Sequence, residues 1–150
     1  MKILVIDDAT VMRVVIKTIL KQSCGIWPEN IVEASNGRDG ITLYKKERPD
    51  IVFLDIKMPD QDGLSVVQAL IKHDPQAVII MVTASPQRND VRTCISAGAK
   101  DYILKPPSPA RMRKALMTFA PYVMKNTPPA ADEPQKKAKP DAKDIDGTRF

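Results

Sequence analysis

Apolar positions along the chain follow two alternating patterns. Uninterrupted apolar runs, which predict fully buried strands, occupy residues 3–6, 31–32, 51–54, 78–82 and 102–104. Apolar residues at three- and four-residue spacing, which predict helices, occupy 12–20, 41–44, 64–71, 91–95 and 109–119. Strands that are apolar at every position are typical of parallel sheets covered by helices on both faces. We therefore predict a three-layer α/β fold, a doubly wound (βα)5 unit with a five-stranded parallel sheet.

The composition changes near residue 126. Residues 126–150 combine four prolines with ten charged residues of both signs and almost no large apolar side chains. Such a segment cannot bury enough apolar surface to offset the entropy of ordering it. We predict one folded domain over residues 1–125 and a disordered Pro/Lys/Asp-rich tail over 126–150. The tail charges cancel, so the net charge of +5 belongs to the folded part.

Chemically capable side chains follow four of the five predicted strands; they are Asp7, Asp8, Asp55, Thr83 and Lys105. In open parallel sheets, ligands bind beyond the carboxyl ends of the strands. A single aspartate there could simply cap the next helix. Three carboxylates, one hydroxyl and one ammonium group converging on the same edge instead predict a functional site.

Three neighbouring carboxylates repel one another unless a cation lies among them. Oxygen ligands favour Mg²⁺ (or Mn²⁺) over zinc or copper, and such ions commonly bridge a protein to a phosphoryl group. A carboxylate can itself accept that group, and Asp55 is the candidate, with Asp7 and Asp8 positioning the metal. Lys105 would balance the phosphoryl charge and Thr83 would donate a hydrogen bond to it.

Several short motifs follow one another in order along the chain. They are Asp7-Asp8 after the first apolar run, Asp55 followed by Pro59 and Gly63, Thr83-Ala84, Ala97-Gly98-Ala99 and Lys105-Pro106. This ordered set, over about residues 2–124, resembles the response-regulator receiver domains. The resemblance implies the flavodoxin/CheY-like strand order 2-1-3-4-5, of which CheY is itself a standard example.

The resemblance implies a role for each matching residue of the acidic site. Asp55 would be phosphorylated by a histidine kinase. The Mg²⁺ ion would be bound by the carboxylates of Asp8 and Asp55, by Asp7 through a water molecule, and by the backbone carbonyl of Lys57. The protein would thus carry out its own phosphorylation and dephosphorylation without being a turnover enzyme.

The resemblance also implies a switch. Lys105 would contact the phosphoryl group, and Lys105–Pro106 would be a cis peptide. Thr83 would move toward the phosphoryl oxygen and leave space for Tyr102 to rotate. This movement would change the face made by the fourth helix, fifth strand and fifth helix, where an output protein binds.

Residues 7–13 and 97–102 are most similar to the chemotaxis CheY group, which implies the kinase CheA and a flagellar motor switch protein as partners. We expect a monomer or weak dimer. We also expect a cytoplasmic protein, because its N-terminal apolar run is shorter than the roughly 7–15 residues of a signal peptide core. Its apolar stretches are also too short to insert into a membrane. The basic residues are scattered, so we expect no direct contact with nucleic acid.

Three alternatives stay open on the sequence. A haloacid-dehalogenase-type phosphohydrolase also uses an aspartyl nucleophile, but it needs a general acid two residues later, where this chain has Lys57. A receiver-like adaptor that is never phosphorylated would not need the complete set of site residues. A DNA-binding regulator would need a further domain, and roughly 25 residues after the last helix are too few for one.

Overall fold

The computed structural model describes residues 1–84 and 88–126, and only the backbone of residues 88 and 122–126. Over these residues strands and helices alternate as the apolar pattern predicts. The strands are β1 (Ile3–Ile6), β2 (Ile31–Ala34), β3 (Ile51–Asp55), β4 (Ile79–Thr83) and β5 (Asp101–Leu104). The helices are α1 (Thr10–Ser23), α2 (Gly37–Glu47), α3 (Gly63–His73), α4 (Arg88–Ala97) and α5 (Pro109–Asn126), with a short 3-10 turn at Pro28–Asn30.

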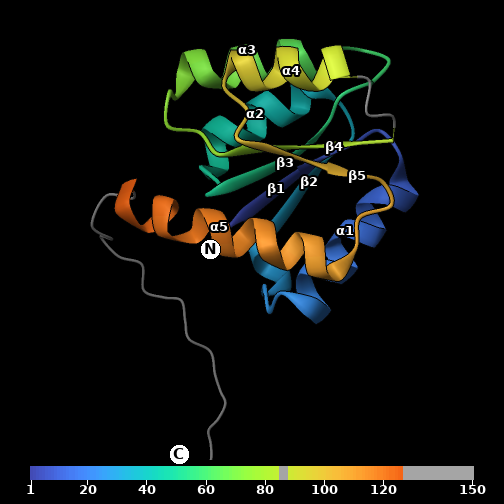
Figure 1. The fold of residues 1–150 in the computed structure, drawn as a ribbon, viewed down its shortest axis with the longest axis vertical. Coiled ribbons are helices and arrows are strands. Elements are labelled where there is room, and N and C mark those ends of the chain that lie inside the picture. Colours follow the sequence, from blue (N-terminus) through green and yellow to red (C-terminus); the bar gives the residue numbers. More distant parts are fainter. Residues whose placement is uncertain (85–87, 127–150) are drawn as a thin grey trace, which may run out of the picture.

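The strands described form one parallel sheet in the order β2-β1-β3-β4-β5 (Figure 1). Strand β1 lies between β2 and β3, with Ile3 opposite both Ile31 and Ile51. At the other end of the sheet, Asp55 of β3 lies opposite Val82 of β4. The predicted (βα)5 fold and its strand order are confirmed, and the aligned strands bring their carboxyl ends to a common edge.

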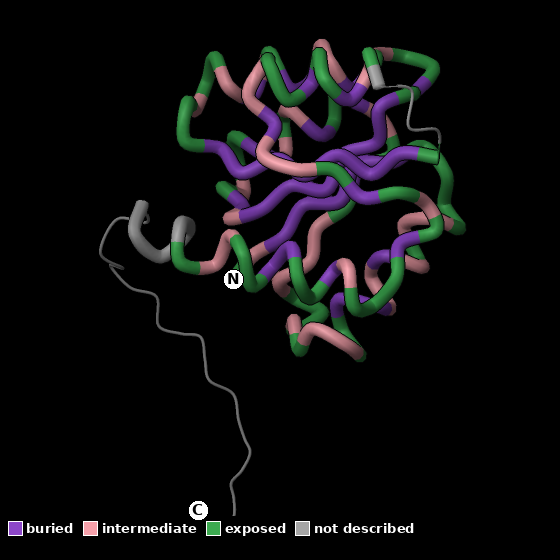
Figure 2. Tube along the Cα trace, in the orientation of Figure 1, coloured by how far each residue is buried: buried purple, intermediate pink, exposed green. Residues whose placement is uncertain are grey.

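Helices cover both faces of the sheet: α1 and α5 pack on one face, and α2, α3 and α4 on the other (Figure 1). Successive side chains of a strand point to opposite faces. Ile3 and Val5 of β1 therefore join the core under α1 and α5, whereas Leu4 and Ile6 join the core under the other three helices. Figure 2 shows that the sheet is the most deeply buried layer. Burial on both faces is the physical reason for the uninterrupted apolar runs.

Helix α5 extends further than the apolar spacing predicts. It begins at Pro109 after Ser108, whose Oγ accepts a hydrogen bond from the Arg111 N–H at 3.1 Å, and it continues through Pro121 to Asn126. Residue 126, the first of the predicted tail, is thus the last of this helix, and the rest of that prediction lies outside the described residues. None of the helices over the described residues has the length and apolar character needed to cross a membrane.

Candidate functional site

The carboxyl edge of the sheet, formed by the ends of β1, β3, β4 and β5, gathers the polar residues of the interior. Among the described residues, the buried polar or charged ones are Asp7 (1% exposed), Asp55 (7%) and Thr83 (4%). Buried polar side chains are unfavourable unless they have partners, and a shared location for all three is not expected of a core built only for stability. The convergence predicted from the strand ends is therefore confirmed.

Backbone hydrogen bonds between strand ends hold these residues side by side. Asp7 follows β1, and its N–H donates to the carbonyl of Ala34 at the end of β2 (3.1 Å). Lys105 follows β5, and its N–H donates to the carbonyl of Thr83 at the end of β4 (2.8 Å). Asp55 is the last residue of β3, between them in the sheet. The sheet itself thus fixes the spacing of the acidic and basic groups.

The Lys105 ammonium lies between two of the carboxylates. Its Nζ is 2.8 Å from Oδ2 of Asp7 and 3.3 Å from Oδ1 of Asp55. Burial raises the pKa of Asp55, the Asp7 charge raises it further, and Lys105 only partly opposes them. Burial acts to lower the pKa of Lys105, but the two carboxylates outweigh it and the pKa is raised. The lysine therefore stays charged, while the site still disfavours a full set of ionised acids.

Asp7, Asp8 and Asp55 each offer a carboxylate oxygen, and these oxygens lie within 4.8 Å of one another. Asp8 is exposed, so the group is open to solvent on one side. Oδ2 of Asp7 is buried and, among the described residues, makes no hydrogen bond of normal angular geometry despite its ion pair with Lys105. A hard divalent cation such as Mg²⁺ or Mn²⁺ matches this all-oxygen set. The residues present fit the expected metal.

The loop between β3 and α3 closes tightly under the site because of Gly63. A Cβ at this position would lie 2.6 Å from the Asp55 carbonyl oxygen and 2.7 Å from the Ile56 Cα. The Gly63 N–H donates to the Ile56 carbonyl at 2.5 Å. In the same loop, the backbone of Lys57 acts to lower the pKa of Asp55, against the larger effects of burial and of Asp7, and Lys57 itself is exposed. A role for its carbonyl as a metal ligand stays a prediction.

The family model described as the response regulator receiver domain matches residues 3–117 of this chain. The chain belongs to the receiver domain family. It is therefore a receiver domain of the kind used in two-component signalling, as the ordered motifs predict.

Known relatives agree with this assignment. The chemotaxis protein CheY of Thermotoga maritima is 41% identical over 115 residues, which are 77% of this chain and 93% of that protein. A CheY-like receiver domain of Methanospirillum hungatei has a TM-score of 0.76 at 25% identity, covering 84% of this chain and 98% of that one. CheY of Borrelia burgdorferi, solved as a CheX–CheY–BeF3–Mg²⁺ complex, has a TM-score of 0.71 at 27% identity, covering 79% and 88%.

The expected switch residues of the receiver domain lie on β4 and β5. Thr83 pairs with Leu104 across the two strands, and Tyr102 lies two residues earlier on β5. Tyr102 is 41% exposed and Leu104 is 47% exposed, so both reach the surface. The Lys105–Pro106 peptide is cis, as the resemblance implies. The movement of Thr83 and Tyr102 stays a prediction.

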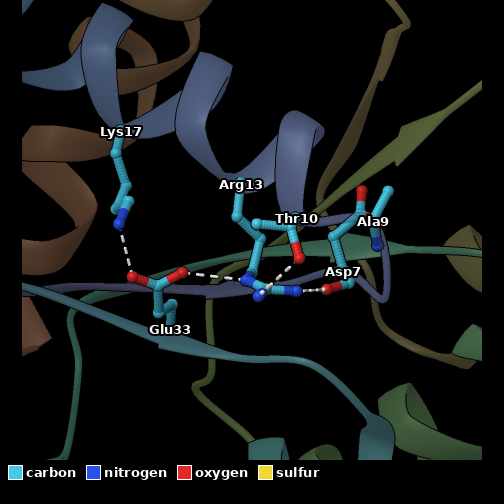
Figure 3. Close-up of polar contacts among 6 residues, drawn as sticks. All are labelled: Asp7, Ala9, Thr10, Arg13, Lys17 and Glu33. Carbon is cyan, nitrogen blue, oxygen red and sulfur yellow. Dashed lines mark hydrogen bonds and ion pairs between the residues drawn. The ribbon is translucent and has the colours of Figure 1, made fainter.

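Two residues beside the acidic site were not predicted to contribute to it. Arg13 of α1 donates from Nη1 to the Asp7 carbonyl (2.7 Å) and from Nε to Glu33 of β2 (2.8 Å), as Figure 3 shows. Arg13 falls within the motif segment 7–13, and Glu33 is the one charged residue of the second strand. Both residues were visible in the sequence. The contact of Arg13 with Asp7, and that of Glu33 with Arg13, depend on how the helix packs beside the sheet.

Proposed function

We propose that this receiver domain accepts a phosphoryl group on Asp55 from a phosphohistidine of a histidine kinase. A carboxylate oxygen of Asp55 attacks the phosphorus, the new O–P bond forms, and the N–P bond breaks with its electron pair on the imidazole, which takes up a proton. The observation that carries the proposal is the carboxyl edge itself, where Lys105 reaches both Asp7 and Asp55 beside an acidic group fit for a metal.

Each residue of the site has a task in this reaction. Mg²⁺ would be held by the carboxylates of Asp8 and Asp55, by Asp7 through a water molecule and by the carbonyl of Lys57. The bound ion offsets the negative charge of the carboxylates and of the incoming phosphoryl group. Lys105, which lies between two carboxylates, would contact the phosphoryl oxygens and balance their charge.

The Borrelia burgdorferi relative supports this assignment, because that CheY was solved in complex with BeF3 and Mg²⁺. Beryllium trifluoride on a carboxylate oxygen has the tetrahedral shape and charge of a phosphoryl group. We infer that the corresponding acidic site of this chain takes the same two ligands.

Phosphorylation then shifts the population of two arrangements of the output surface. We define this surface by the exposed apolar residues Ile95 of α4, Tyr102 and Leu104 of β5, and Met117 of α5. Thr83 links the output surface to the acidic site: its carbonyl accepts a hydrogen bond from the Lys105 N–H, and it lies opposite Leu104 in the sheet. Because the relatives include chemotaxis CheY proteins, we propose a flagellar motor switch protein as the output partner.

Intact mass measurement tests the phosphorylation step. The chain is incubated with acetyl phosphate and Mg²⁺, and one phosphoryl group should add about 80 Da. Asp55→Asn should remove the adduct. Asp60→Asn is the matched control, because Asp60 is an exposed acid in the loop after the same strand, and its adduct should equal that of the wild type.

The outcomes separate the competing functions. No adduct on the wild type would favour an adaptor that is never phosphorylated. An adduct that persists in Asp55→Asn would place the phosphoacceptor elsewhere. We propose no turnover on a separate substrate, because Lys57 supplies no proton to a leaving group at the position where a phosphohydrolase has its acid.

The switch has its own test in Thr83→Ala. This variant should acquire the adduct nearly as well as the wild type, yet its partner should no longer distinguish the phosphorylated from the unphosphorylated form. Binding can be measured by calorimetry with the switch protein encoded nearest to this gene. Equal loss of phosphorylation and of partner binding would contradict the relay through Thr83.

A further inference from the structure

The turn that carries Asp7 and Asp8 is held from outside the acidic site by Arg13 (Figure 3). The Asp7 N–H donates to the Ala34 carbonyl at 3.1 Å, and Oδ1 of Asp7 accepts from the Ala9 N–H at 2.9 Å. Its carbonyl accepts from Nη1 of Arg13 at 2.7 Å. Asp8, between two anchored residues, has its position set by the contacts of its neighbours.

The Asp7 carbonyl lies between two hydrogen-bonding ladders. Strand β1 ends at Ile6, and the first bond of helix α1 runs from the Arg13 N–H to the Ala9 carbonyl at 3.1 Å. A carbonyl at such a junction needs a donor from a side chain or from water. The guanidinium of Arg13, which is on the same helix turn, supplies that donor and thereby sets the direction of the Asp7–Asp8 peptide.

Glu33 anchors the other side of the guanidinium. Its Oε1 accepts from Nε of Arg13 at 2.8 Å, and its second oxygen contacts Nζ of Lys17. The hydrogen bond from Lys17, with help from Arg13, lowers the pKa of Glu33 although burial opposes it. Glu33 is therefore a fixed negative group on β2, opposite Val5 of β1.

We propose that Arg13 is a positioning residue, anchored by Glu33, that holds the Asp7–Asp8 turn in its cation-binding conformation. This inference rests on the proposed metal site. Arg13 is 13% exposed and makes contacts in three directions: to Asp7, to Glu33 and, at 3.4 Å, to Oγ of Thr10. A planar guanidinium can serve several acceptors in fixed directions, whereas the point charge of a lysine cannot.

Charge and geometry predict opposite effects of removing Arg13. As a positive charge beside three carboxylates, Arg13 repels a cation, so its loss would tighten metal binding. As a positioning residue, its loss frees the Asp7–Asp8 turn and weakens metal binding. The sign of the change therefore distinguishes the two roles.

The test uses Mn²⁺ as the probe and the full chain, with free Mn²⁺ measured by electron paramagnetic resonance. Arg13→Ala should weaken Mn²⁺ binding about tenfold, the order found when groups that orient metal ligands are removed. Arg13→Lys should also weaken it, because it keeps the charge and loses the geometry. Glu33→Ala should give a smaller loss, since Arg13 remains and only its anchor is gone.

Lys17→Ala is the matched control, because Lys17 contacts the same glutamate and does not contact Asp7 in the contacts described. Its Mn²⁺ affinity should equal that of the wild type. Amide hydrogen exchange of Ala9 in the metal-free protein gives a second measurement. Exchange should accelerate in Arg13→Ala and in Arg13→Lys, but not in Lys17→Ala.

The wild-type arm separates the two proposals. A wild type that binds no Mn²⁺ would overturn the proposed metal site and the role of Arg13 together. A wild type that binds Mn²⁺, with Arg13 variants that bind it equally well or more tightly, would overturn only the role of Arg13. If Arg13→Ala does not fold, Arg13→Lys decides the question by the same criterion.

Discussion

The two ends of the sheet differ in how their charged and polar side chains are paired. At the carboxyl edge, the carboxylates of Asp7, Asp8 and Asp55 lie close together, and the ion pairs described there join Lys105 to Asp7 and Asp55. At the amino edge, which precedes β1, β3 and β4, polar groups have individual partners. Lys2 pairs with Glu47 at 3.0 Å, its backbone N–H donates to Asp50 at 2.7 Å, and Tyr44 donates to Asp74 at 2.7 Å.

This difference distinguishes contacts that stabilise the fold from a group of side chains suited to binding a ligand. Matched groups at the amino edge satisfy one another and hold the loops before the strands. The carboxyl edge holds more acidic groups than basic partners for them. Burial, followed by the charge of Asp7, raises the pKa of Asp55. Stability alone gives no reason to bury repelling acids, whereas binding a divalent cation does.

The largest effect is expected from removing the cation of the carboxyl edge. Lys105→Met leaves Asp7 and Asp55 buried without this counter-ion, and the loss of one partner from a buried ion pair costs about 3 kcal/mol. Urea unfolding at neutral pH without divalent cations measures the loss. Added Mg²⁺ should stabilise this variant more than the wild type, in which Mg²⁺ at ten times Kd contributes about 1.4 kcal/mol.

Lys2→Met is the matched control at the amino edge. It removes the Nζ contact with Glu47 but keeps the backbone hydrogen bond to Asp50. A partly exposed ion pair contributes little, so the loss should be much smaller than for Lys105→Met, and Mg²⁺ should not change it. Equal losses in the two variants, both insensitive to Mg²⁺, would contradict the contrast between the edges.

An intermediate effect is expected from Tyr44→Phe. The buried Tyr44 hydroxyl donates to the Asp74 carboxylate, and removing a hydrogen bond to a charged group costs about 1.5 kcal/mol. Burial, followed by Asp74, raises the pKa of Tyr44, so this contribution is complete below about pH 10, the unfolded value, and is lost as the pH rises through the higher folded pKa. A loss that Mg²⁺ reversed would show that the amino edge belongs to the functional site.

The smallest effect is expected from Asp55→Asn, and its sign is opposite. The folded state raises the pKa of Asp55, so between the unfolded and folded values the folded state binds more protons, and stability falls as the pH rises through this window. Asp55→Asn should remove this decline and stabilise the metal-free protein at neutral pH by about 1 kcal/mol. Thermal unfolding from pH 4 to 7 measures it; an unchanged pH slope would show that Asp55 is not under this repulsion.

Much of the fold and of the acidic site was predictable because both depend on local pattern. The five apolar runs became strands, and Asp7, Asp55, Thr83 and Lys105 met at one edge because parallel strands end together. The strand order itself came only from the family resemblance. Helix α5 ran to Asn126, beyond the last apolar residue of its predicted spacing, Phe119.

The sequence by itself determined which residues form buried strands and which polar groups follow them, because strands and helices differ in the spacing of apolar residues that are close in the sequence. Only the tertiary structure decided the hydrogen bonds from Arg13 to the Asp7 carbonyl and from Tyr44 to Asp74. The same is true of the close approach of Gly63 to the backbone of Asp55. These contacts join different elements or the two ends of a loop. They depend on the packing angle of a helix or the path of a loop, and no short-range pattern encodes such distances.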